Sequence, residues 1–261
     1  MKPSKIYKAE NAIIVAAGVG ERLSPLTDAT PKPLIKVQGK PMIESIIDAM
    51  IQNGITEIVV VVGHLREQFD YLPDQYPSVR IILLFNPYYD TCNNISSLYV
   101  AREYLKSSII TDGDMMIHNP KILYPYFEAS GYCSSWAEET KEWLQKVDEV
   151  DVVKSCSRTG GQKGWQLYSI SFWNQNDSNK LRTHLEELFE KRKITDVYWD
   201  DIPMFYYKQE YVLKIRRIHR ADLNEIDDLQ ELRELQELYE PEEIEIREKQ
   251  RTLNHLKGEN L

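Results

Sequence analysis

The chain has 261 residues, of which 42% are hydrophobic and 28% are charged, and its formal net charge is −9. This length suits one large α/β domain or two small ones, and the ordinary composition excludes collagen-like, coiled-coil and wholly disordered chains. No apolar run reaches the roughly 20 residues that a membrane-spanning helix needs, and no secretory signal is recognisable. The three cysteines form no C-x-x-C pair. We therefore expect a cytoplasmic protein with reduced thiols and no membrane partner.

The negative charge is concentrated near the C-terminal end. Residues 222–261 contain 13 of the 41 acidic residues and 5 of the 32 basic ones, so the rest of the chain has 28 acidic and 27 basic residues. A nearly neutral body offers no positive surface for nucleic acid. Any phosphate that this protein binds must be held by a few well-placed cations.

Apolar runs alternate with amphipathic segments over the first half of the chain. We expect strands at 12–16, 58–62, 79–85 and 108–111, and helices between them at 42–53, 65–76 and 95–105. This alternation predicts an α/β fold, a Rossmann-like three-layer sandwich with a mostly parallel mixed sheet.

The second half loses this alternation. Short pieces within 132–156 and a run at 166–173 predict antiparallel strands, which we expect to extend the sheet at one end. Further helices are expected at 181–193, 196–208 and 227–239. The pattern predicts one domain over residues 1–240 and a charged tail over 241–261.

The most informative segment is the glycine loop that follows the first strand. It reads V-A-A-G-V-G-E-R-L-S-P-L-T-D-A-T-P-K-P-L over 15–34. A dinucleotide fingerprint would need a third glycine, and a Walker A loop would need G-K-[ST] directly after Gly20. Alone, Gly18 and Gly20 could form an ordinary strand-to-loop turn. Arg22 and Lys32 supply the cations that phosphate binding needs, and we expect both on an exposed loop that prolines stiffen.

This loop resembles the one that marks the nucleotidyltransferases that activate sugar phosphates and choline phosphate. The family pattern, A-A-G-x-G-x-R-L-x-P-L-T followed by P-K, is matched at every position. The resemblance implies that the glycines cradle the nucleotide, that Arg22 holds the β- and γ-phosphates, and that Lys32 lies at the α-phosphate. It also implies a nucleotide half over about 11–114 and an acceptor half over about 115–227.

The same resemblance implies a Mg²⁺ site made by two acidic residues. Asp114 ends T-D-G-D after the fourth strand, where the family has a D-x-D whose second acid binds the metal. Asp227 ends N-E-I-D before the last helix, at the place of the family's second ligand. Taken alone, Asp114 could be an ordinary loop acid and Asp227 a helix N-cap. No nucleophilic side chain is needed, because the acceptor phosphate attacks in line. The catalytic residues are then Lys32 and Arg22, which neutralise charge, and Asp114, which binds the metal.

A narrower resemblance concerns the nucleotide base. The segment 86–98 contains N-N-x-x-S-L and lacks glycine, as in bacterial choline-phosphate cytidylyltransferases. This resemblance implies that cytosine lies against the backbone near Ala16 and Ala17. It places Asn94 and Ser97 within reach of the base, although both could equally cap the helix that follows.

The acceptor half carries E-W at Trp143 and Y-W-D at 198–200, as the choline-activating enzymes do. A quaternary ammonium donates no hydrogen bond, so aromatic faces and a carboxylate hold it. We expect Trp143, Tyr198 and Trp199 to form an aromatic cage with Asp200 as the counter-charge. Core packing is the alternative for each ring.

Together these resemblances imply a CTP:phosphocholine cytidylyltransferase that requires Mg²⁺ and releases CDP-choline and pyrophosphate. CTP and phosphocholine are the expected partners, and a homodimer is a possible assembly. Phosphoethanolamine, another aminophosphonate or a sugar 1-phosphate stay open as acceptors, as does UTP as the nucleotide. A non-catalytic nucleotide-binding regulatory domain is the alternative of another class.

Overall fold

A nine-stranded mixed sheet forms the centre of this computed structural model, which describes residues 5–235. Its strands are Asn11–Ala16 (β2), Glu57–Val62 (β5), Arg80–Phe85 (β6), Ser108–Asp112 (β7), Gly131–Thr140 (β10), Leu144–Val147 (β11), Val153–Ser157 (β12), Gly161–Trp173 (β13) and Lys214–Arg217 (β14). Four parallel strands lie in the order β6-β5-β2-β7, and β13 joins β7 antiparallel. The chain order of the parallel strands therefore reverses beside β2.

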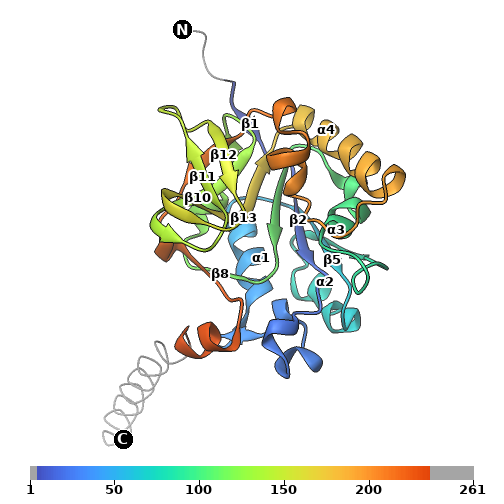
Figure 1. Cartoon of the computed structure of the whole chain (residues 1–261). Helices are drawn as coiled ribbons and strands as arrows, with labels where there is room; N and C mark the ends of the chain where they lie inside the picture. The colour runs from blue at the N-terminus through green and yellow to red at the C-terminus, as the bar shows by residue number, and fades with distance from the viewer. Residues whose placement is uncertain (1–4, 236–261) are drawn as a thin grey trace, which may run out of the picture.

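Helices cover both faces of the parallel strands (Figure 1). They are Met42–Gln52 (α1), Leu72–Gln75 (α2), Ile95–Val100 (α3) and Gln175–Leu185 (α4). Neighbouring residues of β2 point to opposite faces, as the pleat of a strand requires. Ile14 joins the apolar cluster that contains α1, whereas Ile13 joins the cluster that contains α3 and α4. The expected three-layer α/β fold is confirmed.

The expected antiparallel extension is also present. β10 pairs with β13 along most of its length, and β11 pairs with both β12 and β13. Figure 1 shows these strands gathered at one side of the parallel sheet. No pattern in the sequence predicted β14, a short charged strand that runs parallel to β10.

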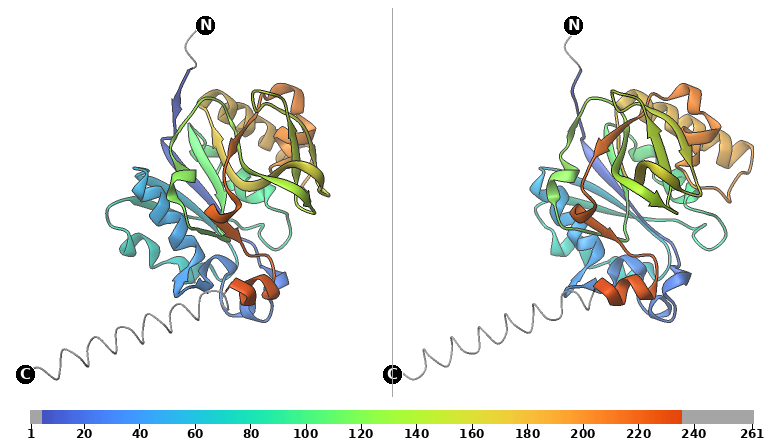
Figure 2. Two further views of the ribbon diagram at one scale, coloured as in Figure 1. Left: turned by 90° about the vertical axis from the view of Figure 1, so that its left-hand side faces the viewer. Right: turned by 60° about the vertical axis from the view of Figure 1, so that its left-hand side comes forward.

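Three two-stranded sheets complete the fold. They pair Tyr7–Lys8 (β1) with Tyr126–Phe127 (β9), Lys36–Val37 (β3) with Lys40–Pro41 (β4), and Met115–Ile117 (β8) with Leu223–Glu225 (β15). The β8–β15 pair has the largest consequence. It returns the C-terminal segment to the end of β7, as Figure 2 shows.

Three of the predicted helices have clearly different bounds in the structure. The segment expected at 65–76 is a 3-10 turn followed by the four-residue α2, which has a proline at its start, and the helix expected at 95–105 is α3 plus a 3-10 turn. The helix expected at 181–193 begins earlier, at Gln175, because the Asn174 side chain accepts hydrogen bonds from two backbone amides of α4. A π-helical turn continues it to Lys191.

The prediction of a helix at 196–208 is wrong. Residues 196–200 are irregular, and only a short helical turn that includes Ile202–Tyr206 and a 3-10 turn at Lys208–Glu210 follow. Within the helix expected at 227–239, residues 229–235 are helical. Its remainder and the tail 241–261 lie outside the described residues. None of the described helices is both long and apolar enough to cross a bilayer.

Candidate functional site

The signature loop, residues 17–34, leaves the carboxyl end of β2 and makes three short 3-10 turns. Gly20 has a φ of +73°, and its carbonyl accepts a hydrogen bond of 2.9 Å from the Thr27 hydroxyl. A Cβ at position 20 would lie 3.2 Å from Cβ of Lys32, so glycine lets the loop fold back over this lysine. A Cβ at Gly18 would have no neighbour within 4 Å. The backbone of Gly18 therefore faces open space.

Lys32 joins the two predicted metal ligands. Its Nζ donates to Oδ2 of Asp114 at 2.6 Å and to Oδ1 of Asp227 at 3.1 Å. Arg22 donates to the same Asp227 oxygen at 2.6 Å. Burial acts to lower the pKa of Lys32, but the two carboxylates outweigh it and raise the pKa above its ordinary value. Lys32 is therefore a charged ammonium at neutral pH.

The two cations of the loop differ in exposure. The Arg22 side chain is 70% exposed, whereas that of Lys32 is only 9% exposed. The expectation that both lie on an exposed loop is therefore wrong for Lys32. Its ammonium group is buried because the two carboxylates supply the partners that a buried charge requires.

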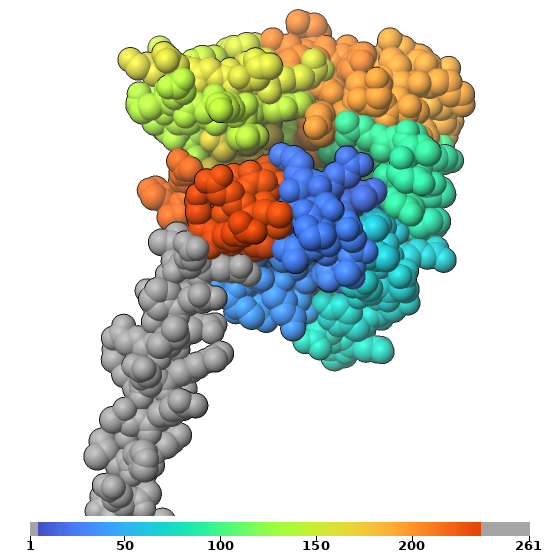
Figure 3. Space-filling view, turned by 60° about the horizontal axis from the view of Figure 1, so that its bottom comes forward, coloured from blue at the N-terminus to red at the C-terminus, as the bar shows by residue number. Residues whose placement is uncertain are grey.

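The C-terminal segment brings Asp227 to the signature loop through the β8–β15 pair. Asp228 accepts the hydrogen bonds from the first backbone amides of the following helix, so Asp228 rather than Asp227 is the N-cap. Figure 3 shows this segment directly against the signature loop. An apolar cluster fixes the contact; its buried members are Leu23, Ile35, Val37, Met42, Met116, Ile226, Leu232 and Leu235.

The residues around Lys32 fit a hard divalent cation. Oδ1 of Asp114 is buried and has no hydrogen-bond partner, and carboxylate oxygens are the ligands that Mg²⁺ prefers. Burial and the charge of Asp114 raise the pKa of Asp112, and burial, Asp114 and Asp227 raise that of Glu225. No three His, Cys, Asp or Glu side chains of residues 5–235 form a ready metal site. Mg²⁺ would therefore take most of its ligands from substrate and water.

Three adjoining cavities surround this group. The loop cavity, of about 600 Å³, lies over the signature loop. The extension cavity, of about 420 Å³, lies beside β13 and the turn that precedes β11. The strand-end cavity, of about 180 Å³, lies at the ends of β2 and β7. Lys32 lines the loop and strand-end cavities, and Arg22 lines the loop and extension cavities. Asn94 and Asp114 are shared by the extension and strand-end cavities. The shared residues place Lys32 and Asp114 where the cavities meet.

Most of the predicted nucleotide residues lie at these cavities. Ala16 and Gly18 line the strand-end cavity, whereas Ala17 is buried. Asn94 is the N-cap residue of α3, but its side chain makes no capping hydrogen bond. Its Oδ1 instead accepts a hydrogen bond from the Trp199 backbone amide. Ser97 is buried, and its hydroxyl accepts a hydrogen bond from Asn86.

The structure separates the predicted aromatic cage. Trp143, Tyr198 and Asp200 line the extension cavity, and the two rings meet edge to face with centroids 5.9 Å apart. Trp199 is only 1% exposed and packs against Tyr132 and Trp173 in the core. The expected cage role of Trp199 is therefore corrected to core packing.

Asp200 is buried beneath the extension cavity. Burial raises its pKa to about 7, the Tyr132 hydroxyl acts in the opposite direction, and the neighbouring charge of Asp201 raises it further. Oδ1 of Asp200 has no hydrogen-bond partner. This carboxyl group can therefore accept a donor from a ligand, and it changes charge near neutral pH.

Several lining residues were missed from the sequence. Asp112, Ser169 and Glu225 all line the extension cavity, as does Glu142 beside Trp143. Asp112 and Glu225 each lie two residues before a predicted metal ligand, a spacing that returns to the same face of an extended chain. That alternation was the available signal. Ser169 lies inside β13, and a serine within a strand is not by itself a signal of a site.

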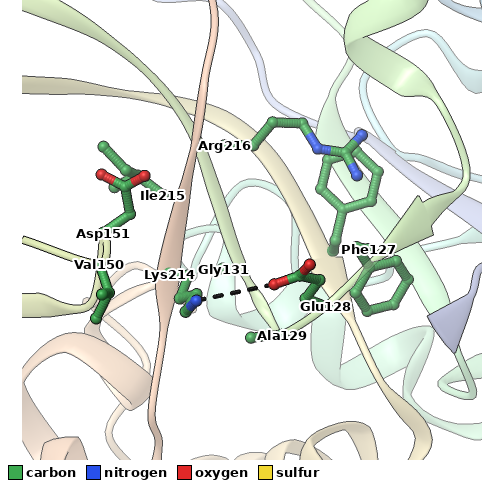
Figure 4. Close-up of a pocket in the computed structure, with 10 residues that line it drawn as sticks. Phe127, Glu128, Ala129, Gly131, Val150, Asp151, Lys214, Ile215 and Arg216 are labelled. Carbon is green, nitrogen blue, oxygen red and sulfur yellow. Dashed lines mark ion pairs between the residues drawn. The ribbon is translucent and has the colours of Figure 1, made fainter. Parts of the chain in front are cut away.

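Another cavity, of about 250 Å³, lies beside β9, β10 and β14 (Figure 4). Arg216 there donates to three backbone carbonyl oxygens and lies over the Phe172 ring, and Lys214 pairs with Glu128. It contains none of the residues predicted from motifs. Its cations serve the packing of this edge, and it is not the candidate site.

The fold and this site define a nucleotidyltransferase. The nucleotidyl transferase family model matches residues 11–123. The chain is 34% identical to a 2-aminoethylphosphonate cytidylyltransferase of Lancefieldella rimae, over 83% of this chain and 88% of the relative. It is 33% identical to a choline-phosphate cytidylyltransferase of Streptococcus pneumoniae, over 83% and 92%.

A solved structure agrees with these relatives. The CTP:phosphocholine cytidylyltransferase of Streptococcus pneumoniae superposes with a TM-score of 0.80 at 32% identity, covering 90% of this chain and 100% of that one. The chain therefore belongs to the nucleotidyltransferase family. The resemblance predicted from the glycine loop is confirmed.

Replacing Arg22 or Lys32 by alanine should lower kcat/KM by at least about 10²-fold, the scale for removing one preorganised charge from a transition state. Steady-state kinetics checks this, and thermal unfolding separates the two variants. Arg22→Ala should keep the wild-type Tm because its side chain is exposed. Lys32→Ala should also lower Tm, since it leaves the partly buried Asp114 carboxylate without its cationic partner. Near-full activity in either variant would show that the triphosphate lies elsewhere.

Proposed function

We propose that this protein is a cytidylyltransferase that transfers CMP from CTP to a small phosphate or phosphonate carrying a cationic amine, with phosphocholine as the first candidate acceptor. The observation that carries the proposal is the group formed by Lys32, Arg22, Asp114 and Asp227 at the reversal of strand order, where α/β sheets bind their ligands. The cytidylyltransferase relatives support CTP as the nucleotide.

The charge of the extension cavity supports a cationic acceptor. Its described lining includes six acidic residues but a single basic one, Arg22. A sugar 1-phosphate brings only negative charge and hydroxyl groups to such a wall. An amine-bearing phosphate places its cation against the acids and against the Trp143 ring. The cavity therefore favours the amine-bearing acceptors over sugar phosphates.

The second candidate acceptor is 2-aminoethylphosphonate. The free Oδ1 of Asp200 favours it, because a primary ammonium can donate a hydrogen bond to this oxygen and a trimethylammonium cannot. The edge-to-face pair of Trp143 and Tyr198 favours phosphocholine, because aromatic faces attract a quaternary cation. The two acceptors thus depend on different groups of one cavity.

The chain's own residues position the reaction. Arg22 and Lys32 bind the triphosphate and offset its negative charge, and Gly18 leaves room for it beside the strand ends. Asp114 and Asp227 would hold Mg²⁺, which when bound supplies charge neutralisation at the phosphates. The acceptor's phosphate or phosphonate oxygen attacks the α-phosphorus, and the bond to the pyrophosphate leaving group breaks.

A substrate panel tests the proposal directly. Purified protein is incubated with each of the four nucleoside triphosphates and with phosphocholine, phosphoethanolamine, 2-aminoethylphosphonate or glucose 1-phosphate, and pyrophosphate release is measured. We expect turnover with CTP and an amine-bearing acceptor. Preference for glucose 1-phosphate would overturn the acceptor class, and no pyrophosphate with any pair would favour a non-catalytic nucleotide-binding domain.

Asp114→Asn and Asp227→Asn should each abolish turnover that depends on Mg²⁺ while the protein stays folded. The physical reason is that an amide oxygen carries no net charge to hold the ion. Turnover is measured over a Mg²⁺ titration, with circular dichroism as the control for folding. Activity of the wild type in excess chelator would contradict the metal requirement.

Trp143→Leu should raise KM for phosphocholine by about 2- to 30-fold, which corresponds to the loss of a cation–π contact of about 0.5 to 2 kcal/mol. KM for CTP should hardly change, because the ring lines the extension cavity only. Leucine is preferred to alanine since it leaves a smaller void. Equal changes for both substrates would show that the ring has a structural role.

Acceptor binding should depend on the ionisation of Asp200. Its pKa of about 7 means that the carboxylate is half protonated near neutral pH, so KM for the acceptor should fall as pH rises from 6.5 to 8. Asp200→Asn should remove this dependence and raise KM at pH 8. The measurement is a pH series of initial rates with both proteins. A variant that keeps the wild-type profile would rule out Asp200 as the counter-charge.

A further inference from the structure

Lys32 lies between the two carboxylates that would hold a metal ion. Its Nζ is 2.6 Å from Oδ2 of Asp114 and 3.1 Å from Oδ1 of Asp227. A Mg²⁺ ion bound to carboxylate oxygens lies about 2.0–2.1 Å from each of them. An ammonium group and a divalent cation cannot both occupy the space between these two carboxylates, because they would repel each other at contact distance.

We propose that Lys32 fills the metal position while no nucleotide is bound, and that it leaves this position when a triphosphate arrives. The metal then binds tightly only together with the nucleotide. This inference rests on the metal site of the proposed function and deepens it. It gives Lys32 a second role, which is to keep the two carboxylates paired between turnovers.

The surroundings of Lys32 allow its ammonium group to move without the backbone. Pro31 and Pro33 flank the residue, and Lys32 begins a 3-10 turn, so its backbone is constrained. Its side chain lines both the strand-end cavity and the loop cavity. A rotation of the side chain therefore transfers Nζ from the carboxylates into space that a triphosphate would occupy.

The charge balance explains why an ammonium group is held between these carboxylates. Asp112 and Glu225 are close enough for their charges to act on those of Asp114 and Asp227, so four acidic groups share one half-buried region. Without a cation the carboxylates would repel one another. Lys32 offsets this repulsion, and any metal that enters without nucleotide has to displace it.

The test is Mn²⁺ binding to the full chain, measured from the free-ion signal in electron paramagnetic resonance, with no nucleotide present. We expect weak binding by the wild type and at least about 10-fold tighter binding by Lys32→Gln, because the competing charge is gone. Mn²⁺ should also raise the Tm of Lys32→Gln more than that of the wild type. With α,β-methylene-CTP, the wild type should bind Mn²⁺ tightly.

Three variants act as controls. Lys32→Arg keeps the positive charge and should bind Mn²⁺ as weakly as the wild type. Lys36→Gln removes an exposed positive charge just after the signature loop and should leave the Mn²⁺ affinity unchanged. Asp114→Asn added to Lys32→Gln should abolish the gain in affinity. If Lys32→Gln binds Mn²⁺ no more tightly than the wild type while the analogue still promotes binding, this inference is overturned and the metal site stands. If no protein binds Mn²⁺ even with the analogue, the metal site and the inference both fail.

Discussion

One buried cation connects the parts of this molecule that matter for its chemistry. The Lys32 ammonium pairs with Asp114, 82 residues away, and with Asp227, 195 residues away. A charge that is 9% exposed is stable only when its partners are held in place, so the signature loop, the end of β7 and the segment after β15 must all assemble around it. The site and the fold therefore depend on the same contacts.

The order of the strands explains why these partners meet. Because the parallel strands run β6-β5-β2-β7, the loops after β2 and β7 leave neighbouring strands at the same edge of the sheet. The crevice between them receives Gly18 and Lys32 from the first loop and Asp114 from the second. The β8–β15 pair then brings Asp227 to the same crevice from the far end of the described chain.

The acceptor half of the site is formed by the antiparallel extension rather than by the ends of the parallel strands. The antiparallel extension forms a wall of acidic and aromatic side chains, with Trp143 and Tyr198 at its surface and the Asp200 carboxyl group buried beneath it. A buried acid with a raised pKa is suited to a cationic ligand, since the incoming positive charge favours the ionised form. The nucleotide half of the site thus offsets the negative charge of the phosphates, and the acceptor half selects the amine group of the acceptor.

The sequence by itself determined the family and most of the central sheet. The spacing of glycine, arginine, proline and lysine over 15–34 identifies the family. Continuous apolar runs rich in β-branched residues predict the buried strands. Local signals failed where tertiary contacts decide the outcome. The helix expected at 196–208 is interrupted because its residues pack individually into the core and the cavity wall, which no helical period describes.

Only the tertiary structure could separate Tyr198 from Trp199. These neighbours have the same aromatic character, yet one is 47% exposed beside the cavity and the other is 1% exposed in the core. The sequence also does not predict the burial of Lys32, because a lysine on a proline-rich loop is expected to be exposed until its ion-pair partners are known. The physical reason is common to both cases. The environment of a side chain is set by residues distant along the chain, and the sequence records which residues are present but not which of them meet.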